Sequence, residues 1–235
     1  MGAIFRREFK AFFTGAIGCV VLAVMFAYSG YNFFAANLFS GSSDLSYIFS
    51  NLYTISLFAI PFLTMRLFSE DKKQKTDQAL LTSPTGLTSI VLGKFFAALL
   101  LYIVSISITL VYAVVIATKV SPDWMVVIGN YIGLAMVGGV VIAIGVLISS
   151  LTESQIIAAI GTLAVSILLI SLDILPIIFG TNEAVAAVTE FLSLNSRYTD
   201  FTIGMIHYDN IIFFLTTQAL FLFLTVRVLD SRRWN

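Results

Sequence analysis

Long runs of apolar residues, separated by short polar segments, dominate the chain. A helix needs about 20 apolar residues to cross a bilayer core of about 30 Å, and six segments meet that length. They are residues 14–34, 48–67, 95–117, 125–148, 156–179 and 210–229. Strict alternation of apolar and polar residues is absent, so a transmembrane barrel is not expected. The pattern predicts an all-α membrane protein, one domain over 1–235 with six transmembrane helices.

The composition agrees with this prediction. Hydrophobic residues make up 59% of the 235 residues and charged residues only 11%, whereas soluble domains are about 45–50% apolar and about 25% charged. A soluble domain could not cover so much apolar surface. The 13 basic residues balance the 13 acidic residues, which gives no indication of a nucleic-acid partner. The single cysteine, Cys19, excludes an internal disulfide framework.

Lysine and arginine are distributed unequally among the polar segments. Eleven of the 13 lie before the first span, around the connection between spans 2 and 3, or after the last span. An even number of spans places these eleven on one side, with only Lys119 and Arg197 on the other. Basic residues concentrate on the cytoplasmic side of multi-pass proteins. The distribution therefore predicts two cytoplasmic termini, and it favours six spans over five or seven.

The N-terminal residues 3–13 have aromatic rings on one helical face and cations elsewhere. The rings recur at i, i+4, i+7 and i+8, as Phe5, Phe9, Phe12 and Phe13. The cations are Arg6, Arg7 and Lys10. This pattern predicts an interfacial helix with its rings in the acyl boundary and its cations near anionic headgroups. The alternative is a cytoplasmic extension of the first span.

The connection over residues 68–90 is the longest segment on the cytoplasmic side. Ser69 is placed to cap a helix whose first turn holds Glu70 and Asp71. Lysines follow, and this order of charges suits the helix dipole. Pro84 would end a helix in this connection.

Leucines interrupt this otherwise polar connection, as Leu80, Leu81 and Leu87. Taken alone, these residues are equally compatible with two structures. One is a solvated hairpin, and the other is a docking element that presents leucines to a soluble partner.

On the opposite side, residues 180–209 form an unusually long outer segment. The helical spacing of Val185, Val188 and Leu192 predicts a short helix over residues 182–192. We expect this segment to form short helices that lie on the outer surface or dip into it, because irregular backbone inside a membrane must be covered by protein.

Motifs for enzymatic chemistry are incomplete. Gly93-Lys94 lacks the earlier glycine and the following Ser or Thr of a phosphate loop, so Lys94 is expected to extend to the cytoplasmic headgroups. The single histidine, His207, excludes a multi-histidine metal site. Asp173 lies in an apolar run about 26 Å along its helix, near the outer interface, which favours an interfacial position over a proton relay. The chain is expected to be neither an enzyme nor a metal protein.

Small residues line one face of the fourth span. They recur every four residues, as Gly129 and Gly133 and as Ala135, Gly139 and Ala143. Small residues let helix backbones approach closely in lipid. We favour packing inside the bundle of this chain over a seam between two copies.

Four stretches together resemble the permease subunit of ABC-2-type ATP-binding-cassette transporters, and in particular the short bacterial permeases of gliding-type operons. The N-terminal Phe5–Phe13 resembles the amphipathic elbow helix of that family. The others are the loop Glu70–Pro84 with Leu92–Phe95, the stretch Ser196–Gly204 and the basic tail Arg227–Trp234. The loop is the most specific part, although Lys75 stands where many members have glycine. The resemblance covers nearly the whole chain.

The resemblance implies a transmembrane domain like that of type V exporters. It implies a second permease, either another copy or a sister chain, and a cytoplasmic ABC ATPase on a separate chain. ATP and Mg would be held by that ATPase, so no cofactor is expected on this chain. Residues 68–90 would then act as a coupling loop that contacts the ATPase. The residues carried over to this role are Glu70, Asp71, Lys72, Lys73, Thr76, Asp77, Leu80, Leu81 and Pro84.

The leading hypothesis is therefore a multi-pass permease of the bacterial inner membrane that uses a partner's ATP hydrolysis to export a substrate. Two alternatives belong to other classes. One is an ion-driven secondary carrier that uses Asp173, and the other is a membrane scaffold that transports nothing.

Overall fold

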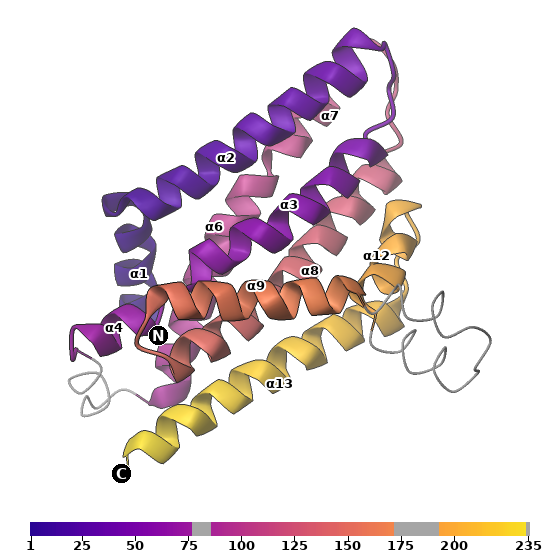
Figure 1. Ribbon diagram of the computed structural model, residues 1–235. Coiled ribbons are helices and arrows are strands. Elements are labelled where there is room, and N and C mark those ends of the chain that lie inside the picture. The colour runs from indigo at the N-terminus through magenta and orange to yellow at the C-terminus, as the bar shows by residue number, and fades with distance from the viewer. Residues whose placement is uncertain (77–85, 172–192, 234–235) are drawn as a thin grey trace.

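The computed structural model describes residues 1–76, 86–171 and 193–233, and every regular element within these ranges is a helix (Figure 1). Five helices are long and apolar enough to cross a membrane. They are Ala16–Phe39, Ser46–Lys73, Leu87–Ala117, Trp124–Leu151 and Tyr208–Ser231. The expected all-helical, multi-pass membrane protein is confirmed at this level.

The helices follow the order of the predicted spans. Their bounds are α1 Gly2–Thr14, α2 Ala16–Phe33, the π-helix η1 Phe34–Phe39, α3 Ser46–Thr64, α4 Ser69–Lys73, α6 Leu87–Ile106, α7 Ile108–Ala117, α8 Trp124–Leu151, α9 Gln155–Ser171, α12 Leu194–Thr202 and α13 Tyr208–Arg233. The third span begins earlier than expected, at Leu87, and it is interrupted at Ser107 between α6 and α7.

The expected fifth span, 156–179, coincides with α9 as far as Ser171. A helix of this length rises about 26 Å, slightly less than a bilayer core of about 30 Å. Residues 172–179 lie outside the described residues, as do Asp173 and the helix expected over 182–192. α9 packs along α3 and α8, and it contacts α4 as well as α12, which lie at opposite ends of the bundle (Figure 1). A sixth span stays a prediction.

α8 is the central helix of the bundle and packs against α3, α6, α9, α12 and α13. It is apolar on all sides, as a helix surrounded by other helices must be. Its start is defined by Asp123, whose Oδ1 accepts hydrogen bonds from the N–H groups of Met125 (3.0 Å) and Val126 (3.5 Å).

The N-terminus, the C-terminal end of α13 and α4 all lie at one end of the bundle (Figure 1). We call this the terminal end, and the end that carries α12 the distal end. α1 packs beside α6, and the chain then turns sharply into α2 at Gly15. Gly18 makes the tight corner possible, because a Cβ there would lie 2.5 Å from the carbonyl oxygen of Phe12.

Candidate functional site

Charged side chains of α1, α4 and α6 meet at the terminal end of the bundle. The Lys94 Nζ lies 2.7 Å from Asp71 Oδ2 and donates a 3.0 Å hydrogen bond to Glu8 Oε1. The Arg7 Nη2 lies 2.6 Å from the same Glu8 oxygen and 4.0 Å from Asp71 Oδ2. These four residues, the charge cluster, form a neutral network because two cations face two carboxylates. It connects three segments that are far apart in sequence.

Lys94 is the buried centre of the charge cluster. Its side chain is 1% exposed, so the expectation that it extends to the headgroups is wrong. The ammonium also donates to the carbonyl oxygen of Leu67, and it lies 5.0 Å from the ring centroid of Phe68. A buried charge is costly unless ion pairs and hydrogen bonds compensate it. Glu8, Asp71 and the Leu67 carbonyl provide that compensation.

Gly93 brings α1 close enough for these contacts. A Cβ at Gly93 would lie 3.0 Å from Cγ2 of Ile4 and 3.4 Å from the backbone nitrogen of Phe5. The Gly93-Lys94 pair therefore holds α1 against α6, since the glycine permits the approach and the lysine binds Glu8. This is a structural role that the partial resemblance to a phosphate loop did not reveal.

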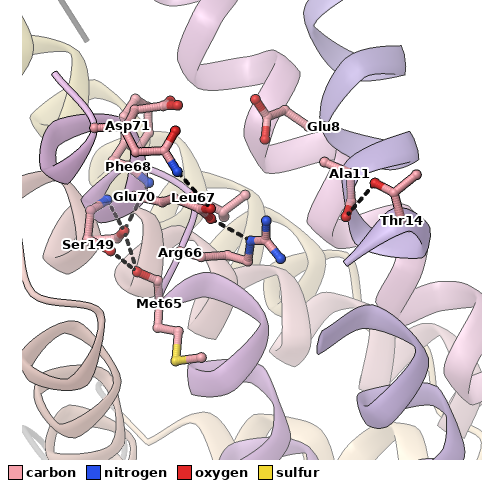
Figure 2. Close-up of polar contacts among 12 residues, drawn as sticks. Glu8, Ala11, Thr14, Met65, Arg66, Leu67, Phe68, Glu70, Asp71 and Ser149 are labelled. Atoms are coloured by element: carbon pink, nitrogen blue, oxygen red, sulfur yellow. Dashed lines mark hydrogen bonds and ion pairs between the residues drawn. The ribbon is translucent and has the colours of Figure 1, made fainter. Parts of the chain in front are cut away.

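α4 begins without the side-chain cap expected from Ser69, so that prediction is wrong. The Ser69 hydroxyl instead donates to the carbonyl oxygen of Met65. Ser149 on α8 instead binds the backbone at the start of α4. Its Oγ accepts hydrogen bonds from the N–H groups of Phe68 (3.0 Å) and Ser69 (3.1 Å), and its hydroxyl donates to the carbonyl oxygen of Met65 (3.1 Å) (Figure 2). These three bonds use the full capacity of one hydroxyl.

Lys72 attaches α4 to the end of α8. Its side chain is buried and donates to the backbone carbonyl of Ser150. A cation is favourable there because Ser150 lies in the last turn of α8, at the negative end of the helix dipole. Ser149 and Lys72 thus hold α4 on α8, while Asp71 holds it on α1 and α6. Neither serine was singled out in the sequence, where both directly follow the predicted fourth span.

Arg66 lies between the α3–α4 junction and the α1–α2 corner. Its Nε is 2.8 Å from Glu70 Oε2, one helical turn later (Figure 2). A Cβ on Gly15 would lie 2.6 Å from Arg66 Nη1, so the guanidinium covers the glycine of the corner. Glu70 is therefore engaged in this ion pair, next to the charge cluster.

α1 has exposed cations and a row of partly covered rings. The exposed cations are Arg6, Arg7 and Lys10. Phe5 and Phe9 stack with centroids 5.9 Å apart, and the chain of rings continues at Phe13. Phe12 is 2% exposed and lies in the protein core, so its expected position in the acyl boundary is wrong.

The acidic partners of Arg7 raise its pKa. Burial lowers the pKa of Arg7, but the hydrogen bond to Glu8 and the charges of Glu8 and Asp71 outweigh this effect, so the pKa is raised overall. The two carboxylates therefore favour the charged form of a guanidinium that is protonated at physiological pH in any case.

α4 ends in a backbone conformation that usually requires glycine. Lys75 has φ 55°. Its N–H donates to Lys72 O (2.9 Å), and the N–H of Thr76 donates to Asp71 O (2.9 Å). This hydrogen-bond pair is the Schellman motif, in which glycine is the usual residue at the left-handed position. The lysine that departs from the family pattern thus occupies the position where the turn favours glycine.

The remaining residues expected in the coupling loop divide into two groups. Lys73 and Thr76 are exposed, and Thr76 Oγ1 donates to Asp71 O (3.1 Å). The others lie outside the described residues: Asp77, Leu80, Leu81 and Pro84.

The small residues of α8 lie against helices of the same chain. A Cβ on Gly129 would lie 2.7 Å from Phe201 O, and one on Gly133 would lie 2.8 Å from Phe201 Cβ, both on α12. A Cβ on Gly139 would lie 2.7 Å from Gln218 Nε2 on α13. Ala143 is buried and Ala135 partly buried. Two further close contacts, Gly138 with Tyr102 and Gly145 with Thr64, were not predicted from the sequence.

The arrangement at the terminal end is suited to transmitting displacement. Among residues 1–76, 86–171 and 193–233, no three His, Cys, Asp or Glu side chains gather as a metal site would require. The carboxylates of the charge cluster instead face cations. Separating buried ion pairs is costly, so a displacement of α4 would carry α1 and α6 with it.

Comparison with known families gives one finding. The family model described as "ABC-2 family transporter protein" matches residues 3–234 of the chain. None of the curated proteins compared with the chain matches it.

Proposed function

Because the chain belongs to the ABC-2 family of transporter proteins, we propose that it is the permease subunit of a transporter whose ATP is hydrolysed on a separate cytoplasmic ABC ATPase. It exports a substrate across the bacterial inner membrane. Our proposal includes six spans with both termini in the cytoplasm, a second permease copy or sister permease, and a relationship to the permeases of gliding-type operons. ATP and Mg are held by the ATPase.

One observation carries the proposal beyond the family: α4 is bound on three sides. Asp71 pairs with Lys94 of α6 at 2.7 Å, Ser149 of α8 binds the start of α4, and Arg7 of α1 lies 4.0 Å from Asp71. α4 also begins the segment 70–84 that resembles the family's coupling loop. An ATPase that moves this segment therefore acts on α1, α6 and α8 together, and the bundle changes between two packed states.

Co-purification with the candidate ATPase tests the docking part of the proposal. The chain is co-expressed with that ATPase, and association and ATP hydrolysis are measured in proteoliposomes. Replacing Leu80 and Leu81 with Asp removes the apolar contacts proposed for docking and should abolish association. Unchanged association would reject the docking assignment. ATP hydrolysis that is indifferent to the presence of the chain would identify a scaffold and reject the permease.

Asp71→Asn tests the transmission part separately. It keeps the size of the side chain but removes the charge that binds Lys94, while Leu80 and Leu81 are unchanged. Association should persist, and the stimulation of ATP hydrolysis by the permease should fall several-fold. The matched control is Asp44→Asn at the distal end, where Asp44 Oδ1 accepts from the N–H of Ser46 (2.8 Å). Equal stimulation in both variants would exclude the charge cluster from coupling.

A further inference from the structure

A small cavity lies at the distal end, away from the charge cluster. Its volume is about 200 Å³, and it is formed by η1, the turn 41–43 and the end of α7 with residues 118–120. η1 is a π-helix, an uncommon conformation that often marks functional sites. The proposed coupling mechanism does not involve this cavity.

Asn37 of η1 forms a fixed wall of the cavity. It is 4% exposed, and its Nδ2 donates 2.9 Å hydrogen bonds to the carbonyl oxygens of Ser42 and Asp44. These bonds hold the turn against η1. The Oδ1 of Asn37 has no hydrogen-bond partner among the described residues. A buried acceptor without a donor is unfavourable.

Lys119 supplies a positive charge at the same cavity. It is exposed, and it forms no ion pair with another described residue. The hydroxyl of Ser43, also in the lining, is a further donor. A cation and a hydroxyl donor together fit a phosphate group.

Exposed apolar side chains also line the cavity, at the end of the bundle that carries exposed aromatic residues. Leu38, Val115 and Val120 line it, with 57%, 44% and 53% of their surfaces exposed. Large exposed aromatic residues occur at the same end of the bundle: Tyr31, Phe39, Tyr47, Trp124 and Tyr208. Aromatic residues concentrate at membrane–water interfaces. A ligand here would have its polar part beside Lys119 and its apolar part along the exposed side chains.

We propose that this cavity binds the headgroup of a phospholipid from the leaflet at the distal end, with its phosphate at Lys119 and an acyl chain along Leu38 and Val115. The site is separate from the charge cluster, so a lipid there can be tested without the ATPase.

Native mass spectrometry of the delipidated full chain, titrated with phosphatidylglycerol, tests the proposal. Lys119→Ala should weaken binding of one lipid about fivefold, the effect of one basic residue near a lipid surface. Val115→Trp fills the cavity without changing charge and should remove the same lipid. A melting curve in detergent shows whether each variant is folded.

The matched control is Arg227→Ala, which removes a cation near the terminal end and should leave this lipid bound. Equal weakening by Arg227→Ala and Lys119→Ala would reveal general attraction of anionic lipid and overturn the proposal. Inorganic phosphate and glycerol phosphate are titrated in parallel. If either binds as tightly as the lipid, the cavity is a site for a free anion, and the lipid assignment is overturned.

Discussion

Lys75 shows how one residue can limit the stability of a short helix. Its φ of 55° places an L side chain in the left-handed region, which costs about 1–2 kcal/mol for residues other than glycine. The hydrogen bonds of the Schellman motif and the contacts of α4 with α8 offset this cost. The conformation persists because Asp71 binds α4 to α6 and Lys72 binds it to α8, just before the turn.

Lys75→Gly should therefore stabilise the end of α4 by at most about 1 kcal/mol, since glycine adopts this conformation freely but loses more entropy on folding. Slower hydrogen exchange of the backbone amides over residues 69–76 would measure the effect. Lys73→Gly is the matched control. Lys73 is helical, so glycine should destabilise there by about 0.5–1 kcal/mol. A change of the same sign in both variants would contradict the prediction.

Lys94 is the residue whose loss should be most costly at the terminal end. Lys94→Met keeps the length of the side chain but leaves Glu8 and Asp71 without their shared partner. Removal of one member of a buried ion pair costs about 3–5 kcal/mol, and this loss is expected in the free energy of unfolding in detergent. Lys73→Met, at an exposed lysine of α4 near the charge cluster, should change it by less than about 0.5 kcal/mol. Equal losses would show that Lys94 is effectively exposed.

At the scale of elements, α12 depends on close contact with α8. Gly129 and Gly133 let its backbone approach, and the Tyr198 hydroxyl donates to Asn130 Oδ1 at 3.1 Å. The Asn130 Nδ2 donates in turn to Thr202 O at 3.3 Å. α12 starts at Ser193, whose Oγ accepts from the N–H of Ser196 at 2.9 Å. A short helix is held in place here by packing and polar contacts that an isolated helix of this length would lack.

Gly133→Ala should loosen this contact. The added Cβ would lie 2.8 Å from Phe201 Cβ and 3.0 Å from a ring carbon of Tyr198, and overpacking of this kind costs about 1–3 kcal/mol. The melting temperature in detergent should fall accordingly. In Gly30→Ala the nearest atom is 3.5 Å away, so helix propensity should stabilise that variant by up to about 1 kcal/mol. A rise in both melting temperatures would contradict the close packing of α12 on α8.

At the scale of the whole molecule, two ends with different chemistry are joined by an apolar bundle. The terminal end carries the charge cluster, α4 and most of the cations, and the distal end carries exposed aromatic residues and α12. The uneven distribution of Lys and Arg predicts that the terminal end faces the cytoplasm.

Cysteine labelling tests this orientation. In a Cys19→Ser background, Ser43→Cys places a thiol at the exposed distal turn and Lys73→Cys places one at the terminal end. A membrane-impermeant maleimide should label Ser43→Cys in intact cells, and Lys73→Cys only after the membrane is permeabilised. Labelling of Lys73→Cys alone in intact cells would invert the orientation, and equal labelling of both would contradict their placement on opposite sides.

Features that depend on residues close together in the sequence were predictable. Apolar runs locate the helices because burial in lipid and backbone hydrogen bonding within a helix act locally. The spacing of the small residues in α8 indicated close packing. The pattern of rings over residues 3–13 indicated the helix that precedes Gly15. The end of α4 was not predicted, because Lys75 stands at the left-handed position where glycine usually marks the end of a helix.

The sequence by itself determined that this is a helical membrane protein of the ABC-2 type, with its cations concentrated in a few polar segments. The tertiary structure decided which charges meet. Glu8 and Lys94 are 86 residues apart, and their contact exists because Gly93 lets α1 approach α6. Lys94 looks like a residue at a membrane boundary when only its neighbours in the chain are considered. Its burial, like the role of Ser149, follows from the packing of distant helices, which local hydrophobicity and charge order do not specify.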